Sequence, residues 1–275
     1  MEIARTIADL RSACRALRER FGAVALVPTM GALHDGHRAL VRQAVGSGAA
    51  VVTSIFVNPL QFGPAEDLTR YPRDEQGDLA KLAESGCHLA WLPDVATMYP
   101  PDDVTTIDVA GPALRWEGDA RPGHFRGVAT VCAKLFGQVR CDRAYFGEKD
   151  WQQLQVVRRM AADLHLPLDI IGVATVREAD GLALSSRNRF LTPDERAVAP
   201  RLHAALLAAA RDLADGSGDG VATQMRSLAA AGFAVEYLAL VDGPTLVPLM
   251  AAQPGARLVA AARLGSVRLL DNVAV

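Results

Sequence analysis

One pattern occurs twice in this chain and limits what the chain can fold into. It consists of an apolar run, a short turn rich in glycine and polar residues, and the start of a helix. In the first copy, residues 23–27 lead into PTMGALHDGH and an apolar periodic stretch at residues 40–45. In the second copy, residues 143–146 lead into GEKD and a helical pattern at residues 151–164. Strands that alternate with helices in this way predict a parallel sheet with helices on its faces.

Other segments extend the alternation through the first part of the chain. Residues 49–57, AAVVTSIFV, are almost continuously apolar and β-branched, as is typical of a strand buried on both faces. Further strands are predicted at 88–92 and 168–173, and helices at 7–20, 37–45, 74–85 and 125–136. The region from residue 94 to 123 is loop-like, with one predicted strand at 104–109. We therefore predict an α/β fold with a Rossmann-like doubly wound parallel sheet over residues 1–177.

The pattern changes after residue 177. Thr192-Pro193-Asp194-Glu195 is a helix start, with a cap, a proline and two acids, and one helix is predicted from there to residue 214. A loop at residues 215–220, a helix at 221–231 and strands at 235–241, 257–262 and 267–270 follow. Residues 178–275 are therefore predicted to form a second, smaller α+β domain at the C-terminal end, acting as a lid.

Composition excludes several classes of function. The net charge is −2, so no overall field favours nucleic acid or an anionic membrane. No apolar run approaches the roughly 20 residues of a membrane span, and the N-terminal stretch lacks the apolar core of a signal peptide. The four cysteines form no C-x-x-C pair, which argues against a zinc or redox motif and favours reduced thiols in a cytoplasmic protein.

The first turn is suited to phosphate. Gly31 and Gly36 let the backbone bend or approach a ligand closely. The helix that follows offers unpaired N–H groups and a positive dipole end, where His34 and His37 would face a bound anion. Two other interpretations stay open on spacing alone: the H-x-x-H pair is half of a metal site, although no nearby residue completes the ligand set, or it is an ordinary surface loop.

Further candidates lie where other predicted strands end. Asn58 and Gln61 follow the strand at residues 49–57, and ligands of open parallel sheets bind at the carboxyl ends of strands. Lys149, one of three lysines in the chain, lies in the second turn as a cation for phosphate, and Asp150 is interpreted as a helix cap or a ligand of a ribose hydroxyl. The SSRN segment at residues 185–188 is either a linker or a phosphate-binding lid. Lys134 is interpreted as a solvated helix residue. His124 is either a site residue or a helix-start residue, and the helix start is slightly favoured. Residues 66–72 are predicted to be irregular.

Taken together, PTMGALHDGH, SIFVNPLQF, RPGHFRGVATV, YFGEKDWQQL and GLALSSRN resemble the pantothenate synthetase family. The resemblance extends over nearly the whole chain, to AARLGSVRLLDN near its C-terminus. It implies a pantoate–β-alanine ligase of the nucleotidyltransferase superfamily with the H-x-G-H signature. ATP and pantoate would give pantoyl adenylate and pyrophosphate, and the β-alanine amine would then release pantothenate and AMP. It also implies Mg²⁺, a homodimer, and partners that are small molecules, with no nucleic acid and no membrane.

The resemblance also implies residue roles. His34, His37 and Lys149 would stabilise the charge that grows on the phosphoryl oxygens, and His37 would also donate a proton. Gln61, Gln153 and Met30 would bind pantoate, with Pro28, Phe62 and Val131 packing on its dimethyl carbon, and Gln61 and Asn58 would lie near β-alanine. The residues implied for ATP are Met30, Gly31, Ala32, Leu33, His34, Asp35, Gly36, His37, Gly147, Glu148, Lys149, Asp150, Val176, Leu184, Ser185, Ser186 and Arg187. No residue is implied as a metal ligand.

Two departures from the family pattern are mild. Trp151 follows GEKD where phenylalanine is more usual, and Arg38 follows the second histidine where leucine is common; neither position must touch a substrate. The sequence leaves three alternative functions open. They are an adenylyltransferase acting on a phosphate-bearing acceptor, a non-catalytic nucleotide sensor on the same fold, and a metal hydrolase. The adenylyltransferase would share the histidine pair but gives no reason for Gln61 and Gln153.

Overall fold

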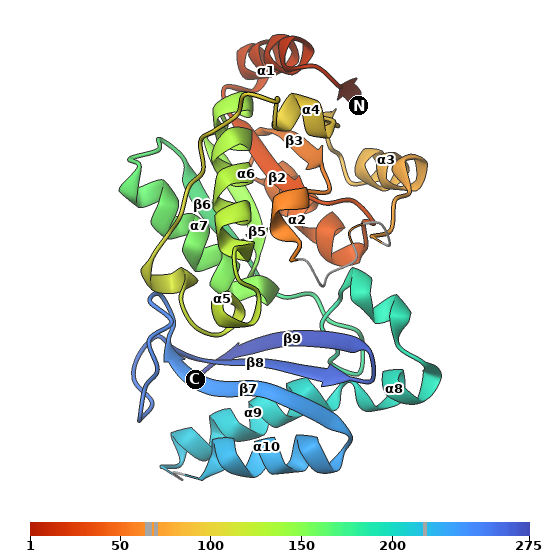
Figure 1. The fold of residues 1–275 in the computed structure, drawn as a ribbon. Helices are drawn as coiled ribbons and strands as arrows, with labels where there is room; N and C mark the ends of the chain where they lie inside the picture. Colours follow the sequence, from red (N-terminus) through yellow and green to blue (C-terminus); the bar gives the residue numbers. More distant parts are fainter. Residues whose placement is uncertain (64–67, 69–70, 217–218) are drawn as a thin grey trace. The chain divides into compact units, whose positions relative to one another are not determined.

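The structure is a computed structural model that describes residues 1–63, 68, 71–216 and 219–275, and it contains two compact units (Figure 1). Unit 1 comprises Met1–Glu148 and Gln153–Ala174, and unit 2 comprises Lys149–Gln152 and Thr175–Val275. The domain division predicted at residue 177 stays a prediction. The contacts add that the short segment Lys149–Gln152 groups with unit 2. The segments predicted at residues 66–72 and 215–220 lie partly outside the described residues.

Unit 1 is built on a six-stranded parallel sheet with the order β1-β4-β3-β2-β5-β6. Its strands are β1 (Glu2–Ala4), β2 (Val24–Thr29), β3 (Ala50–Ile55), β4 (Leu89–Trp91), β5 (Arg143–Gly147) and β6 (Asp169–Val173). From β2 the chain adds β3 and β4 on one side and β5 and β6 on the other, so the strand order reverses at β2. The predicted doubly wound parallel sheet is confirmed. Strand β1 was not predicted, because three residues are too few to show a period.

Helices cover both faces of this sheet. They are α1 (Ile7–Phe21), α2 (Asp35–Gly46), α3 (Glu75–Glu84), α6 (His124–Val139) and α7 (Trp151–Asp163), with the short α4 (Val95–Met98) and α5 (Glu117–Ala120). On one face, Leu40 of α2 and Leu82 of α3 share a buried cluster with Val27 of β2. On the other, α1 and α6 contact each other and β2. Because strand side chains alternate between two covered faces, β2 and β3 are mostly apolar along their length, which is why their apolar pattern is almost continuous.

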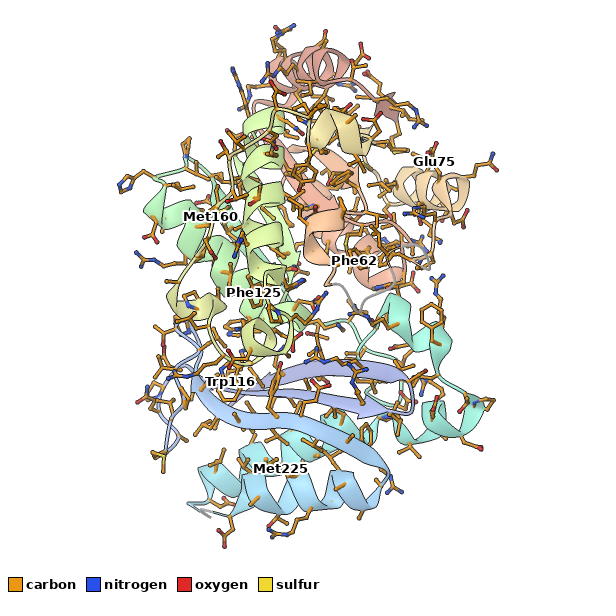
Figure 2. The ribbon with its side chains drawn as sticks, in the orientation of Figure 1. Phe62, Glu75, Trp116, Phe125, Met160 and Met225 are labelled. Carbon is orange, nitrogen blue, oxygen red and sulfur yellow. The ribbon has the colours of Figure 1, made fainter. Side chains whose placement is uncertain are left out.

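Unit 2 is a three-stranded antiparallel sheet in the order β7-β8-β9, packed on helices. The elements are α8 (Pro193–Val198), α9 (Arg201–Ala214), α10 (Gly220–Ala230), β7 (Phe233–Asp242), β8 (Ala256–Leu264) and β9 (Val267–Ala274). Leu206, Leu228 and Leu258 lie in its core, and Met225 of α10 packs against them (Figure 2). The predicted small α+β architecture is confirmed.

Two predicted elements are wrong. No strand forms at residues 104–109; Val104 is 90% exposed, and the Ile107 N–H donates to Thr130 Oγ1 of α6 at 3.0 Å instead of to a neighbouring strand. The single helix predicted from residue 193 to 214 is two helices, α8 and α9. Pro200 lies at the break, because its ring removes a backbone donor and crowds the preceding turn.

The interpretation of Lys134 as a solvated residue is also wrong. Its Nζ pairs with Asp103 at 2.6 Å and lies 5.2 Å from the ring centroid of Tyr99. His124 does begin α6, as predicted. Burial raises the pKa of Cys14 to about 11 and those of Cys132 and Cys141 to about 12, so these thiols stay protonated near neutral pH. Among the described residues, no helix is long and apolar enough to cross a membrane.

Candidate active site

The histidine pair lies at the head of α2, directly after β2. His34 is the N-cap of the helix and His37 lies in its first turn. The two rings are half-buried and their centroids are 4.1 Å apart. The residues between strand and helix bend sharply, with positive φ at Gly31 and at Ala32. This geometry places two imidazoles and the positive end of a helix dipole at one edge of the sheet.

Backbone hydrogen bonds fix which ring nitrogen of each neutral histidine carries the proton. The Gly36 N–H donates to Nδ1 of His34 at 3.1 Å, and the His34 N–H donates to Nδ1 of His37 at 3.4 Å. A nitrogen that accepts a hydrogen bond carries no proton, so each neutral imidazole holds its proton on Nε2. The pair therefore presents two Nε2–H donors, a set suited to oxygen atoms of a phosphate.

A buried carboxylate holds the turn that precedes the histidines. Asp78 of α3 is 1% exposed and accepts hydrogen bonds from the Ala32 and Leu33 N–H groups at 2.8 and 2.7 Å. A Cβ at Gly31 would lie 3.0 Å from its Oδ2, so this close approach requires glycine. Those two N–H groups are occupied by Asp78, which leaves the side chains and the helix end to face a ligand. Asp78 was not predicted, although its position four residues before the buried Leu82 puts an acid on the apolar face of α3.

Asn58 and Gln61 follow β3, the neighbour of β2, at the same edge of the sheet. Asn58 is 1% exposed, and backbone groups on both sides fix its amide: Oδ1 accepts from the Leu60 N–H at 3.2 Å and Nδ2 donates to the Gly127 carbonyl at 3.1 Å. Nδ2 also donates to Oε1 of Gln61 at 2.8 Å, and the Tyr99 hydroxyl donates to Oδ1 at 2.8 Å.

The orientation of the Gln61 amide follows from these bonds. Since its Oε1 accepts from Asn58, its Nε2 is the outward group, and Nε2 forms no hydrogen bond with any residue that the structure describes. Asn58 has both of its donors and its acceptor oxygen engaged. Asn58 is therefore placed to orient Gln61, and Gln61 is placed to donate to a ligand oxygen.

The backbone of Gln61 is held from α6. The Gln61 carbonyl lies 3.0 Å from Nδ1 of His124 and 3.2 Å from a guanidinium nitrogen of Arg121. A Cβ at Gly127 would lie 2.1 Å from the Leu60 carbonyl oxygen, so α6 and the short helix η1 (Pro59–Gln61) pack backbone to backbone. The sequence left His124 as either a site residue or a helix-start residue, and its contact with Gln61 had no local signal.

In unit 2, Lys149 and Asp150 end the short helix η4 (Glu148–Asp150), and α7 begins at the next residue. The Lys149 carbonyl accepts from Nδ2 of Asn272 at 2.9 Å. The Trp151 indole N–H donates to the Gly243 carbonyl at 2.7 Å, and the Arg257 guanidinium lies 3.5 Å from the Trp151 ring centroid. These contacts explain why Lys149–Gln152 groups with unit 2.

The SSRN segment forms a capped helical turn. Ser185 caps the short helix η5 (Ser186–Phe190), accepting from the Arg187 N–H at 3.2 Å. Arg177 and Ala183 pair across the hairpin that leads into it. Arg177 also forms a two-pronged ion pair with Asp271 of β9, at 2.7 and 2.8 Å. The linker interpretation of this segment gives no reason for such anchoring.

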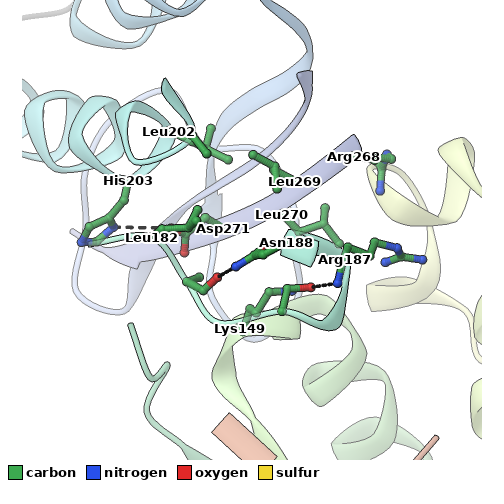
Figure 3. A pocket seen from close by; sticks show the side chains of 13 residues that line it. Lys149, Leu182, Arg187, Asn188, Leu202, His203, Arg268, Leu269, Leu270 and Asp271 are labelled. Atoms are coloured by element: carbon green, nitrogen blue, oxygen red, sulfur yellow. Dashed lines mark hydrogen bonds and ion pairs between the residues drawn. The ribbon is translucent and has the colours of Figure 1, made fainter. Parts of the chain in front are cut away.

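A pocket in unit 2 brings several of these side chains together (Figure 3). Its lining includes three predicted residues, Lys149, Ser185 and Arg187. The lining also includes Asn188 of the SSRN segment and three polar residues that were not predicted, His203, Arg268 and Asp271. Nδ1 of His203 lies 3.5 Å from Asp271 Oδ2, an ion-pair distance rather than a hydrogen bond. Two arginines, a lysine and a hydroxyl in one lining suit an anionic ligand.

The remaining predicted residues have these positions. Met30, Pro28 and Phe62 are half-buried beside the two strand ends of unit 1, Asp35 is exposed in the first turn of α2, and Val131 is buried in α6. Gly147 ends β5, Glu148 begins η4, and Gln153 is half-buried in α7. Val176, Leu184, Ser186 and Asp150 belong to unit 2 outside the lining of its pocket. Groups of three or more histidines, cysteines or acids that would hold a metal do not occur among the described residues, so the metal-hydrolase alternative finds no ligand set there.

Comparisons with known proteins address the chain as a whole. The sequence profile of the family described as pantoate-beta-alanine ligase matches residues 2–274. The pantothenate synthetase of Acidiphilium cryptum is 60% identical over 278 residues, which cover all of both chains. The crystal structure of pantothenate synthetase from Thermus thermophilus is 50% identical and superposes with a TM-score of 0.93, covering 99% of each chain.

A third relative was solved with ligands. The pantoate-beta-alanine ligase from Francisella tularensis, complexed with beta-gamma ATP and beta-alanine, is 30% identical, with a TM-score of 0.82 over 100% of this chain and 97% of that one. Full-length coverage at this identity, together with the matching profile, shows that the chain belongs to the pantoate-beta-alanine ligase family.

Proposed function

We propose that this pantoate–β-alanine ligase of pantothenate biosynthesis works in two steps. In the first, the pantoate carboxylate attacks the α-phosphorus of ATP, the bond to the β-phosphate breaks, and pantoyl adenylate and pyrophosphate form. In the second, the amine of β-alanine attacks the acyl carbon, loses a proton and displaces AMP to give pantothenate. The Francisella relative, complexed with an ATP compound and β-alanine, supports both ligands for this chain.

The residues of unit 1 receive the following roles. The Nε2–H groups of His34 and His37 donate hydrogen bonds to phosphoryl oxygens and so stabilise the negative charge that develops there. Met30, Gly31, Ala32, Leu33, Asp35 and Gly36 form the rest of the ATP-binding turn, together with Gly147 and Glu148 after β5. The N-terminal end of α2 adds its dipole to the same anion.

The residues of unit 2 carry cations and hydroxyl groups for the phosphates. Lys149 stabilises the phosphoryl transfer, and Ser185, Ser186 and Arg187 bind phosphate oxygens, with Asp150, Val176 and Leu184 completing the ATP-binding set. The pocket that holds Lys149, Ser185 and Arg187 in one lining supports this grouping.

Pantoate is bound by glutamine amides. The outward Nε2 of Gln61 donates to a pantoate oxygen, and Gln153 forms hydrogen bonds with the hydroxyl or carboxylate group of pantoate. The dimethyl carbon of pantoate packs against apolar side chains, namely Met30, Pro28, Phe62 and Val131. Gln61 also lies near the β-alanine amine. Asn58 was predicted near β-alanine; its saturated hydrogen bonds favour a role through Gln61.

Mg²⁺ is proposed to enter with the phosphates of ATP. At such sites the ion commonly keeps several waters and binds one or two carboxylates besides the phosphates, so a dedicated cluster of protein ligands is not required. The described residues contain no such cluster, which fits an ion carried mainly by the nucleotide. Bound there, it would help to neutralise the charge of the leaving pyrophosphate. A homodimer and a cytoplasmic location are also proposed, both on the family resemblance.

The observation that carries this function is the pair of Nε2–H donors at the head of α2, at the same edge of the sheet as the oriented Gln61 amide. The experiment measures pyrophosphate release from ATP and Mg²⁺, with and without pantoate, before β-alanine is added. We expect release that depends on pantoate, followed by AMP and pantothenate once β-alanine is supplied. Release that is indifferent to pantoate would point to the adenylyltransferase alternative, and ATP binding without turnover would favour the nucleotide sensor.

A further inference from the structure

Two neighbouring residues of the last strand, Asp271 and Asn272 of β9, contact the two segments of unit 2 that carry the proposed phosphate ligands. Each is 5% exposed. Successive side chains of a strand point to opposite faces, so the two residues reach different parts of the unit. Neither is a phosphate ligand in the proposed function.

Asn272 holds the Lys149 segment. Its Nδ2 donates to the Lys149 carbonyl at 2.9 Å, and its Oδ1 accepts from the Arg257 guanidinium. Arg257 in turn covers the ring of Trp151, whose indole N–H donates to the Gly243 carbonyl. The backbone of residue 149 and the side chain of residue 151 are therefore both fixed to the sheet of unit 2.

Asp271 holds the hairpin that leads into Ser185 and Arg187. Its carboxylate accepts two hydrogen bonds from Arg177 and one from the Asn272 N–H at 2.7 Å. Arg177 also donates to the Gly181 carbonyl at 3.1 Å, across the turn of the hairpin. A buried carboxylate that accepts a two-pronged guanidinium fixes both direction and distance, more than a single hydrogen bond would.

From these contacts we infer that Asp271 and Asn272 are positioning residues of the ligation reaction. Asn272 fixes the position of the backbone at Lys149, and Asp271 fixes the position of the loop that carries Ser185 and Arg187. One strand therefore holds the proposed cationic and hydroxyl groups in a constant arrangement. The inference rests on the proposed function for what Lys149 and Arg187 do. Displacement of a catalytic group by about 1 Å can cost as much as 10²-fold in rate, so such anchoring matters for turnover.

A double-mutant cycle in the full-length chain tests whether Asn272 acts through Lys149. Asn272→Ala is expected to lower kcat for pantoate-dependent pyrophosphate release about 10- to 100-fold, with KM for pantoate changed less than about twofold. In a Lys149→Ala background the same substitution should cost less than about threefold, because the group that it positions is already gone. Equal factors in both backgrounds would show that Asn272 does not act through Lys149 and would overturn the inference.

A second measurement reports whether the Lys149–Gln152 segment is held in place, and it does not depend on enzyme activity. The indole N–H of Trp151 should exchange faster with solvent in Asn272→Ala, as followed by NMR, because the Arg257 contact loses its anchor. The Trp91 indole in unit 1, which donates to Gln138 Oε1 at 3.1 Å, is the internal control and should not change. Leu228→Val, a core change in α10 of the same unit, is the matched control for a general loss of stability and should leave Trp151 exchange unchanged.

The two measurements separate this inference from the proposed function. If Lys149→Ala kept nearly full turnover, the catalytic role of Lys149 would fail, and the indole exchange alone would decide on the anchoring. Unchanged exchange at Trp151 in Asn272→Ala would overturn the inference whatever the activity of the Lys149 variant.

Discussion

At the scale of single residues, hydrogen bonds to the backbone decide which atoms face a substrate. Both histidines use Nδ1 to accept from backbone N–H groups, and Asn58 turns the Gln61 amide nitrogen outward. Sequence spacing predicted the residue types but not these orientations, because the partners come from turns and from α6. The donor atoms of the proposed site therefore depend on groups that are not themselves proposed to touch a substrate.

Removal of the His37 imidazole should slow the first step without preventing nucleotide binding. We expect His37→Ala to lower kcat for pyrophosphate release about 10²–10³-fold, the usual cost of one preorganised donor to a developing oxyanion. Steady-state kinetics checks this, with an ATP titration by calorimetry as the control for binding. Nearly full kcat in His37→Ala would contradict the role.

Loss of the Gln61 amide should weaken pantoate far more than ATP. A hydrogen bond to a charged group contributes about 1.5–3 kcal/mol, so Gln61→Ala should raise KM for pantoate roughly 10- to 100-fold. Tyr99→Phe removes only the hydroxyl bond to Asn58, whose amide two backbone groups still orient, and its effect should be a few-fold at most. Equal weakening of ATP and pantoate by Gln61→Ala would contradict this assignment.

The buried carboxylate of Asp271 makes the stability of the chain depend on pH. Burial acts to raise the pKa of Asp271, but the nearby His203 and the Arg177 guanidinium outweigh burial and hold the pKa below its usual value. A carboxyl with a lowered folded pKa contributes stability above its unfolded value of about 3.9, and loses it as pH falls through the folded pKa. The ion pair is therefore intact at neutral pH.

Asp271→Asn should accordingly be less stable than the wild type at pH 7, by about 3 kcal/mol, because Arg177 loses a charged partner at a buried site. The difference between the two proteins should shrink as pH falls below about 4, where the carboxyl of the unfolded chain takes up a proton, and should disappear below the lowered pKa of the folded state. Urea unfolding between pH 3 and pH 7 measures it. A difference that stays constant over this range would show that the ionised carboxylate is not what stabilises the fold.

At the scale of elements, the alternation of strand and helix was predictable and its interruptions were not. Continuous apolar runs revealed β2 and β3, since both faces of these strands are covered. The short β1 carries too little pattern, and the expected strand at 104–109 fails because Thr130 takes the Ile107 N–H. The break between α8 and α9 was readable from Pro200, and was missed because the apolar period continues across it.

The packing of α6 on η1 gives a test with a matched control in the same helix. A Cβ at Gly127 would lie within 2.9 Å of three backbone atoms of Leu60 and Gln61, whereas a Cβ at Gly137 meets nothing within 4 Å. Gly127→Ala should displace η1, destabilise the protein and raise KM for pantoate. Gly137→Ala should instead stabilise it by roughly 0.5–1 kcal/mol, the helix preference of alanine over glycine. Thermal unfolding and pantoate kinetics of both variants check this; equal behaviour would contradict the close packing.

At the scale of the whole molecule, the chain passes between the two units three times, since Lys149–Gln152 belongs to unit 2 while the residues on either side belong to unit 1. The sequence showed a change of pattern near residue 177, but nothing in it indicated that the four residues Lys149–Gln152 belong to unit 2. The contacts responsible, from Gly243, Arg257 and Asn272, lie about 90 to 120 residues further along the chain. A pattern of local periodicity contains no information on such distant pairs.

The scarcity of lysine allows the proposed site to be probed in the unmodified protein. Lys81, Lys134 and Lys149 are the only lysines of the sequence, and their side chains are 37%, 23% and 18% exposed. An amine-reactive acetylating reagent followed by peptide mass spectrometry therefore reports each lysine separately. Mg-ATP at ten times its Kd should slow acetylation of Lys149 about tenfold, because the reagent then reacts only with the fraction of the protein that has no ATP bound.

Lys81 pairs with the buried Asp78 and Lys134 pairs with Asp103, and neither is a proposed ATP ligand, so both serve as controls inside the same molecule. Their acetylation should be unchanged by ATP, and loss of ligase activity should follow the labelling of Lys149 alone. Equal protection of all three would indicate a general tightening of the protein. Labelling of Lys149 that is indifferent to ATP would remove it from the nucleotide site, since a cation bound to phosphate cannot remain equally open to acetylation.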